Sequence, residues 1–191
     1  MNFQYETSRL LLKIENETAA DKVLAFYQKN RPYFDAWELT RPDNFYTRGY
    51  QGASLQVEYN EIIKRHFIRF WVYEKNIYEN DPAHAPVIGS VSISNIRLGG
   101  FLSGMFGYKL DHDYWGKGYA TEACKKLIEI AFADCGLHRL ESFIMPANEQ
   151  SLKLIKRLSF SYEGTDKKSI EVNHHYEDHL RYALLNDALE T

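Results

Sequence analysis

The chain has few cysteines, no long apolar run and no surplus of basic residues, and each shortage excludes a class of protein. Only two of its 191 residues are cysteine, Cys124 and Cys135, which is too few for a disulfide framework. No stretch approaches the roughly 18 to 20 apolar residues of a membrane-spanning helix, and residues 1–6 lack the basic and apolar regions of a secretory signal. A net charge of −3 argues against a general nucleic-acid binder. We therefore expect a cytoplasmic protein that binds neither membrane nor nucleic acid.

What the sequence does contain is the composition of a globular protein, with 45% hydrophobic and 26% charged residues. No repeat, low-complexity tract or linker divides it, so we expect a single domain over residues 1–191. The hydrophobic patterns predict strands at residues 8–14, 68–74, 87–96, 139–145, 161–165 and 174–185, another strand ending at 110, and helices at 17–30, 50–67, 119–135 and 148–158. Arg31-Pro32 is expected to end the first helix, and residues 76–86 to form a mobile connection.

The most informative segment is Asp113-Tyr-Trp-Gly-Lys-Gly-Tyr-Ala-Thr-Glu-Ala-Cys124, which lies between a strand pattern and a helix pattern. The start of a helix leaves backbone N–H groups without partners and carries a partial positive charge. Gly116 and Gly118 lack the Cβ atoms that would hold an anion away. The segment therefore predicts a phosphate or pyrophosphate site, although a plain glycine turn would also fit. It is not the phosphate-binding loop of nucleotide triphosphatases, because the Gly-x4-Gly-Lys-Ser/Thr spacing is absent. It is not a dinucleotide fingerprint, because Thr121 replaces the third glycine.

A second segment, residues 138–160, begins as a strand, breaks at Pro146 and restarts as a helix with Asn148 at a plausible N-cap. The order strand, glycine turn, helix, strand, Asn-x-x-Ser and helix resembles the GNAT superfamily of acetyl-CoA-dependent N-acetyltransferases. Further segments are similar to its RimJ/RimL-like branch, the ribosomal-protein alanine N-acetyltransferases, and these are residues 26–37, 88–96, 106–110, 137–141 and 176–185. The resemblance covers roughly residues 8 to 186.

This resemblance implies an α/β (α+β) fold. Its central mixed, mostly antiparallel, twisted sheet would have about seven strands with a splay between the fourth and fifth, flanked by about four helices. It also implies acetyl-CoA as cofactor and direct transfer, in a ternary complex, to the N-terminal α-amine of a protein such as a ribosomal protein. Fold and cofactor do not fix the acceptor. A small-amine acetyltransferase (for a polyamine, amino acid or antibiotic) and a non-catalytic acyl-CoA-binding module stay open, as do a monomer and a homodimer.

The resemblance also assigns cofactor contacts. The backbone of residues 115–121 would hold the pyrophosphate, and the backbone of residues 106–110 would pair with the pantetheine arm. The expected contacts are Phe106, Tyr108, Leu110, Trp115, Gly116, Lys117, Gly118, Tyr119, Ala120, Thr121, Asn148 and Ser151. Asp113 stands where the family commonly has Arg or Gln, and we expect its side chain to point to water.

The catalytic residues are less clearly marked. By resemblance to the RimJ/RimL-like branch, Ser151 is suited to donate a hydrogen bond to the leaving thiolate. Many other GNAT members use a tyrosine four residues farther on, where this chain has Ile155; a capping-turn serine is the alternative. Phe143 stands where members with a general base often have a glutamate. Glu141 and Glu171 are the remaining candidates for that base. A water wire without any side-chain base would also serve, since an α-amine is partly neutral near its pKa of about 8.

Acceptor recognition is expected from the N-terminal half and the closing hairpin. The candidate groove residues are Trp37, Tyr46, Asn95, Phe101 and Met145, although ordinary core packing would equally explain the aromatic ones. His175, Glu177 and His179 share one face of a predicted strand and have zinc-binding side chains. Because no metal-site motif accompanies them, we expect no metal.

Overall fold

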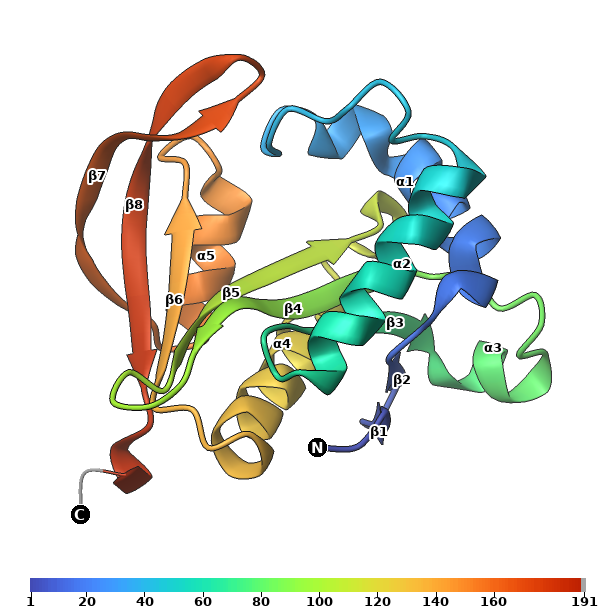
Figure 1. Ribbon diagram of the computed structural model, residues 1–191, viewed down its shortest axis with the longest axis horizontal. Coiled ribbons are helices and arrows are strands. Elements are labelled where there is room, and N and C mark those ends of the chain that lie inside the picture. Colours follow the sequence, from blue (N-terminus) through green and yellow to red (C-terminus); the bar gives the residue numbers. More distant parts are fainter. Residues whose placement is uncertain (190–191) are drawn as a thin grey trace.

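The computed structural model describes residues 1–189 and is organised around one eight-stranded sheet (Figure 1). The strands are β1 (Gln4–Glu6), β2 (Leu10–Lys13), β3 (Ile68–Glu74), β4 (Gly89–Arg97), β5 (Ser103–Leu110), β6 (Arg139–Ile144), β7 (Ser161–Val172) and β8 (His175–Leu185). Their order in the sheet is β1-β2-β3-β4-β5-β6-β8-β7, and every neighbouring pair is antiparallel except β5 and β6.

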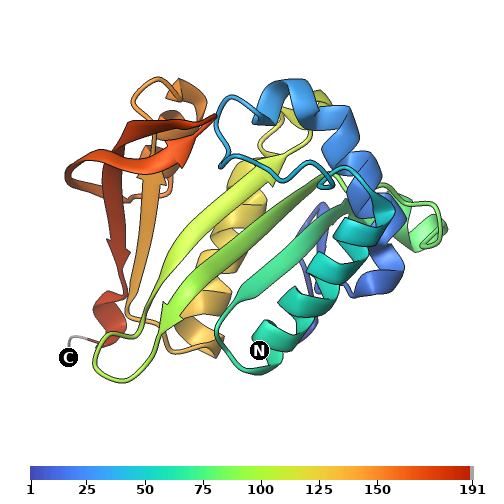
Figure 2. The ribbon, with the colours of Figure 1, turned by 45° about the horizontal axis from the view of Figure 1, so that its top comes forward.

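Helices cover both faces of this sheet. They are α1 (Ala20–Phe34), α2 (Arg48–Ile63), α3 (Lys75–Asn80), α4 (Tyr119–Glu129) and α5 (Glu149–Arg157), and a π-helical turn, Ile130–Asp134, extends α4. Alternation along the strands builds two cores. Phe70 and Val72 of β3 pack with residues of α4, whereas Trp71 and Tyr73 pack with residues of α1. In Figure 2, α2 lies in front of the sheet and α4 behind it.

The splay separates the two halves of the sheet. β5 and β6 pair only from Ser103 and Arg139 to Met105 and Glu141, and the strands then diverge (Figure 2). On its other side, β5 stays paired with β4 as far as Leu110. The backbone edge of residues 106–110 therefore faces open space. The GNAT fold expected from the sequence is confirmed, and this splay between the fourth and fifth predicted strands is part of it.

Some expectations for individual elements were wrong. The sequence predicts about seven strands, whereas the sheet has eight. The additional strand is β1, whose three residues are too few to show a period-two pattern. Pro32 does not end α1, because it lies in the last turn, where few backbone hydrogen bonds remain for a proline to break. The Asp35 N–H still donates to the Arg31 carbonyl at 3.2 Å. Continuation of the helix buries Phe34 against Phe26.

The polar connection expected at residues 76–86 instead begins with α3, whose Tyr78 packs edge-on against Tyr73 of β3. β7 extends past residue 165 to Val172, and two register shifts in its pairing with β8 disguise its length in the sequence. No helix within residues 1–189 is both long and apolar enough to cross a membrane.

Candidate active site

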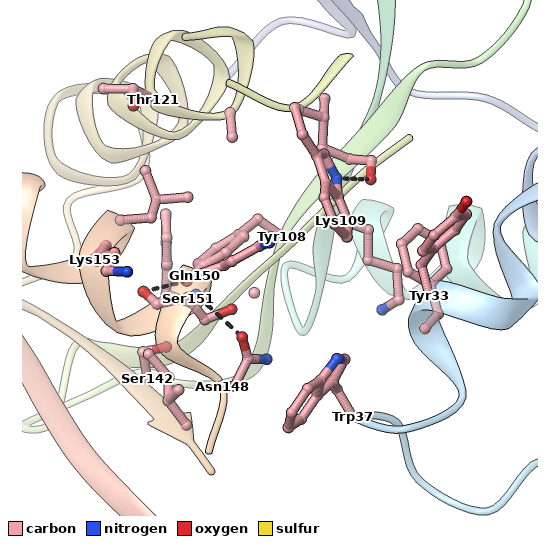
Figure 3. A pocket seen from close by; sticks show the side chains of 18 of the residues that line it. Tyr33, Trp37, Tyr108, Lys109, Thr121, Ser142, Asn148, Gln150, Ser151 and Lys153 are labelled. Atoms are coloured by element: carbon pink, nitrogen blue, oxygen red, sulfur yellow. Dashed lines mark hydrogen bonds between the residues drawn. The ribbon is translucent and has the colours of Figure 1, made fainter. Parts of the chain in front are cut away.

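A cavity of about 630 Å³ occupies the splay (Figure 3). It is lined by β5, β6, the loop before α4, the helix α5 and the C-terminal end of α1. Its wall consists of Tyr33, Phe34, Trp37, Glu38, Phe106, Gly107, Tyr108, Lys109, Leu110, Tyr114, Trp115, Gly116, Gly118, Ala120, Thr121, Ser142, Phe143, Ile144, Met145, Asn148, Gln150, Ser151, Lys153, Leu154, Arg157 and His179. Because α1 and the helices α4 and α5 lie on opposite faces of the sheet, the cavity reaches both faces.

The glycine turn forms one wall of this cavity. Gly116 and Gly118 have φ angles of +73° and +82°, which disfavour any residue with a Cβ atom. A Cβ atom added to Gly116 would meet no atom within 4 Å, so open space lies beside the backbone there. The first hydrogen bond of α4 runs from the Glu122 N–H to the Gly118 carbonyl, and the N–H groups of residues 118–121 therefore have no partner within the helix. This cradle fits the pyrophosphate of a coenzyme A derivative.

Two predicted loop residues, Lys117 and Tyr119, do not line the cavity but hold the loop from outside. Arg9, in the turn before β2, donates from Nη1 to the Lys117 carbonyl at 2.9 Å. Its guanidinium lies 4.4 Å from the centre of the Tyr119 ring and pairs with Glu122 of α4. Asp113 is exposed, as expected, and pairs with Lys29 at 2.7 Å.

Asn148 is the N-cap of α5, and its Oδ1 accepts from the Ser151 N–H at 3.1 Å. Figure 3 shows its amide nitrogen directed toward the space between Asn148 and Trp37. The capping role and a role in ligand binding are therefore compatible, since each uses a different end of the amide.

Ser151 lies in the cavity wall one turn into α5. Its carbonyl accepts from the Tyr108 hydroxyl at 3.1 Å, and its own side chain also interacts with that phenol. Burial raises the pKa of Tyr108, so that the phenol remains a donor. Because a hydroxyl hydrogen rotates, the Ser151 hydroxyl can turn from this phenol to donate to a ligand in the cavity.

Glu141 and Glu171, the two acids considered as general bases, lie outside the cavity wall. The carboxylate of Glu141 pairs with Arg97 at 3.1 Å and with Arg139 at 3.0 Å. Glu171 accepts from Thr40 at 3.2 Å, in a contact between the β7–β8 hairpin and the α1–α2 loop. The structure gives neither residue a place beside the splay.

Two titratable residues that the sequence did not single out do line the cavity, Glu38 and His179. Glu38 pairs with Lys109 of β5 at 3.0 Å. His179 is buried, and its Nδ1 lies 3.1 Å from the Glu177 carbonyl. Because a carbonyl only accepts, Nδ1 carries the hydrogen in the neutral ring and Nε2 is left as an acceptor. In the sequence, Glu38 could have been noticed because it directly follows segment 26–37, which carries part of the family resemblance.

The predicted acceptor residues divide into two groups. Trp37 and Met145 line the cavity, whereas Tyr46, Asn95 and Phe101 do not. Tyr46 donates to Asp35 at 2.9 Å in the α1–α2 loop. Asn95 has a left-handed backbone (φ 50°) and donates to the sulfur of Met105 at 2.9 Å. Phe101 lies beneath the guanidinium of Arg97 in the exposed β4–β5 turn.

His175, Glu177 and His179 do not converge on a metal site. His175 is exposed, whereas His179 is buried in the cavity wall. Over residues 1–189, no group of three histidine, cysteine or acidic side chains is arranged to hold a metal ion.

Comparison with known proteins agrees with this geometry. Residues 9–161 match the family described as Acetyltransferase (GNAT) domain. The probable N-acetyltransferase YjcK of Bacillus subtilis (strain 168) is 31% identical over 173 residues, covering 88% of this chain and 90% of that protein. The [ribosomal protein uS5]-alanine N-acetyltransferase of Escherichia coli (strain K12) is 27% identical over 179 residues, 93% of this chain and 88% of that one.

A solved structure is similar over nearly the whole chain. The ribosomal-protein-S5-alanine acetyltransferase of Vibrio fischeri superposes with a TM-score of 0.88 at 29% identity, covering 97% of this chain and 98% of the other.

Proposed function

The chain belongs to the acetyltransferase (GNAT) family and is an N-acetyltransferase that uses acetyl-CoA, and we propose that its acceptor is the N-terminal α-amine of a protein, with ribosomal proteins as the first candidates. The observation that carries this proposal is that the cavity reaches both faces of the sheet. Trp37 and Glu38 lie on the α1 side, opposite the cofactor-binding side with Ser151. The similarity to proteins named as ribosomal-protein alanine acetyltransferases supports the same acceptor class.

Cofactor binding uses the cradle and the splay. The N–H groups of residues 118–121 would hold the pyrophosphate, and the open edge of residues 106–110 would pair with the amide groups of the pantetheine arm. Asn148 adds a side-chain hydrogen bond to that arm. The bound cofactor supplies an acetyl group activated as a thioester.

Transfer forms a C–N bond to the acceptor and breaks the C–S bond of the thioester. The α-amine, with a pKa of about 8, is partly neutral at physiological pH, and Glu38 or Nε2 of His179 takes up the proton it releases. The Ser151 hydroxyl donates to the sulfur as negative charge develops there. Cys124 is fully buried, and burial raises the pKa of its thiol. Because this thiol does not line the cavity, transfer is direct.

The test is thiol release from acetyl-CoA with N-terminal peptides, polyamines and amino-acid amides as acceptors. We expect release with the peptides, and mass spectrometry should place the acetyl group on the α-amine. A matched peptide with a blocked N-terminus and a free lysine should give no release. Release only with polyamines or amino-acid amides would overturn the protein acceptor, and coenzyme binding without release for any acceptor would favour a binding module.

A further inference from the structure

A second cavity, of about 290 Å³, adjoins the first on the α1–α2 side of the sheet. It lies between α2, the α1–α2 loop and strands β3 and β5. Glu38 and Lys109 line both cavities, and the 3.0 Å ion pair between them stands at the boundary. Figure 3 shows Lys109 extending from β5 toward Trp37, across from Asn148. A molecule that reached the splay from this side would therefore extend into the second cavity.

The wall of the second cavity has a surplus of positive charge. It contains three cations (Arg41, Arg69 and Lys109) and two carboxylates (Glu38 and Glu58). All five side chains are at most 28% exposed. Asp35, outside this wall, also pairs with Arg41 at 3.4 Å and balances the surplus. The preference for an anion therefore rests on the guanidinium N–H groups and not on net charge.

The two arginines are rigidly held. The Arg69 guanidinium pairs with Glu58 and lies 5.6 Å from the centre of the Trp71 ring. The Arg41 guanidinium lies 4.3 Å from the centre of the Phe45 ring. The N–H groups of a guanidinium lie in its plane, and their arrangement matches a carboxylate in shape.

Both guanidinium groups also carry a buried nitrogen without a hydrogen-bond acceptor among residues 1–189, Nη2 of Arg41 and Nε of Arg69. The Glu38 carboxylate lies 3.8 Å from Arg41 Nη2, which is beyond hydrogen-bond distance. Buried donors in folded proteins are nearly always paired. A ligand oxygen in this cavity, with a small adjustment of the side chains, would supply the missing acceptor.

From these contacts we propose that the second cavity is an acceptor subsite that binds a carboxylate belonging to the same molecule as the reacting amine. The position of the amine rests on the function proposed above. A monoanionic carboxylate fits better than a phosphate, because a dianion would meet greater repulsion from Glu38 and Glu58. The carboxylate is either an acidic side chain near a protein N-terminus or the free α-carboxylate of a small acceptor.

Calorimetry with product-like dipeptides tests the subsite without turnover. The probes are N-acetyl-Ala-Glu amide, N-acetyl-Ala-Gln amide and N-acetyl-Ala-Gln with a free carboxyl end, each added to the protein with coenzyme A present. We expect at least one of the two acids to bind about tenfold more tightly than the neutral amide. The stronger acid identifies the source of the carboxylate. Equal binding of all three probes would overturn the proposal.

Variants locate the effect. Arg41→Gln should remove the preference for the acid, whereas Arg48→Gln should keep it, because Arg48 is an exposed residue of α2 paired with Asp21 outside the cavity. In case Arg41→Gln does not fold, Ser54→Asp places a carboxylate in the cavity wall and leaves the arginines in place. It should also remove the preference. A preference that persists in a folded Arg41→Gln or Ser54→Asp protein would show that the cavity is not the site.

The two proposals fail separately. Selective binding of the acids by a protein that acetylates no peptide would retain the subsite and overturn the protein acceptor. Acetylation of Glu and Gln peptides at equal efficiency, together with equal binding of the three probes, would retain the protein acceptor and overturn the carboxylate subsite.

Discussion

The hydroxyl of Tyr108 donates a hydrogen bond to the backbone carbonyl of Ser151 at 3.1 Å and so joins β5 to α5 across the splay. Tyr108 belongs to the strand whose unpaired edge faces the cavity, and Ser151 belongs to the helix on the opposite wall. The width of the cavity is therefore fixed by a side-chain contact at a point where the sheet itself is unpaired.

Removal of that contact should loosen the cofactor site. In Tyr108→Phe we expect a loss of about 1 kcal/mol in unfolding free energy, typical for one hydrogen bond, and a KM for acetyl-CoA several-fold higher. Calorimetric unfolding measures the first effect, and steady-state kinetics at varied acetyl-CoA concentration measures the second. An unchanged melting temperature together with an unchanged KM would mean that packing alone sets the width.

Ser151→Ala should lower kcat without weakening acetyl-CoA binding. Loss of one donor to a developing negative charge costs roughly 100- to 1000-fold in rate. The helix should remain intact, because the cap uses the backbone N–H of Ser151 and not its hydroxyl. Ser161→Ala on β7 is the control. Stopped-flow acetyl transfer at saturating substrates is the measurement, and a wild-type rate in Ser151→Ala would remove the serine from the mechanism.

Gly116 and Gly99 form a matched pair for the cradle. Both have left-handed φ angles, +73° and +70°, and neither has an atom within 4 Å of an added Cβ. Each change to alanine should therefore cost a similar 1–2 kcal/mol of backbone strain. Only Gly116→Ala should weaken coenzyme A binding, because only its Cβ enters the cradle. Equal affinities in the two variants, measured by calorimetry, would argue against a pyrophosphate there.

Glu122 should make stability depend on pH. Burial acts to raise the pKa of its carboxyl, but hydrogen bonds from Thr7, Arg9 and Ser8 outweigh it and hold the pKa below its usual value. The stabilisation is therefore present above the unfolded pKa of about 4.3 and is lost as pH falls through the lower folded value. Glu122→Gln should melt a few degrees lower than the wild type at pH 7, and the gap should close in strong acid. A gap that is independent of pH would exclude the linkage.

The parts of the site that the sequence predicts are local. Gly116, Gly118, Asn148 and Ser151 each lie within a few residues of the helix start that they serve, so spacing along the chain reveals them. Glu38 and His179 reach the same cavity from the α1–α2 loop and from β8, more than 100 residues apart, and only the folded sheet brings them together. Glu141 is the opposite case, because the sequence marks it as a candidate base on a suitable strand, whereas its carboxylate pairs with two arginines outside the cavity.

The fold shows the same division. The sequence patterns of the central strands are strong because successive side chains point into the two cores in turn. The pattern is weak where tertiary contacts decide the structure. Tyr78 makes α3 helical by packing on Tyr73, and β7 continues through two irregularities because β8 pairs with it on the far side of each.

A cavity that reaches both faces of a sheet has a kinetic consequence. In the function proposed above, the cofactor enters between α4 and α5 and the acceptor enters beside α1, so neither would block the route of the other. Either substrate is then free to bind first, and the acetylated chain departs without waiting for the spent thiol to leave. In an enzyme arranged this way, the two substrates lie on opposite faces of the sheet and meet at the splay, and only the acetyl group moves from one face to the other.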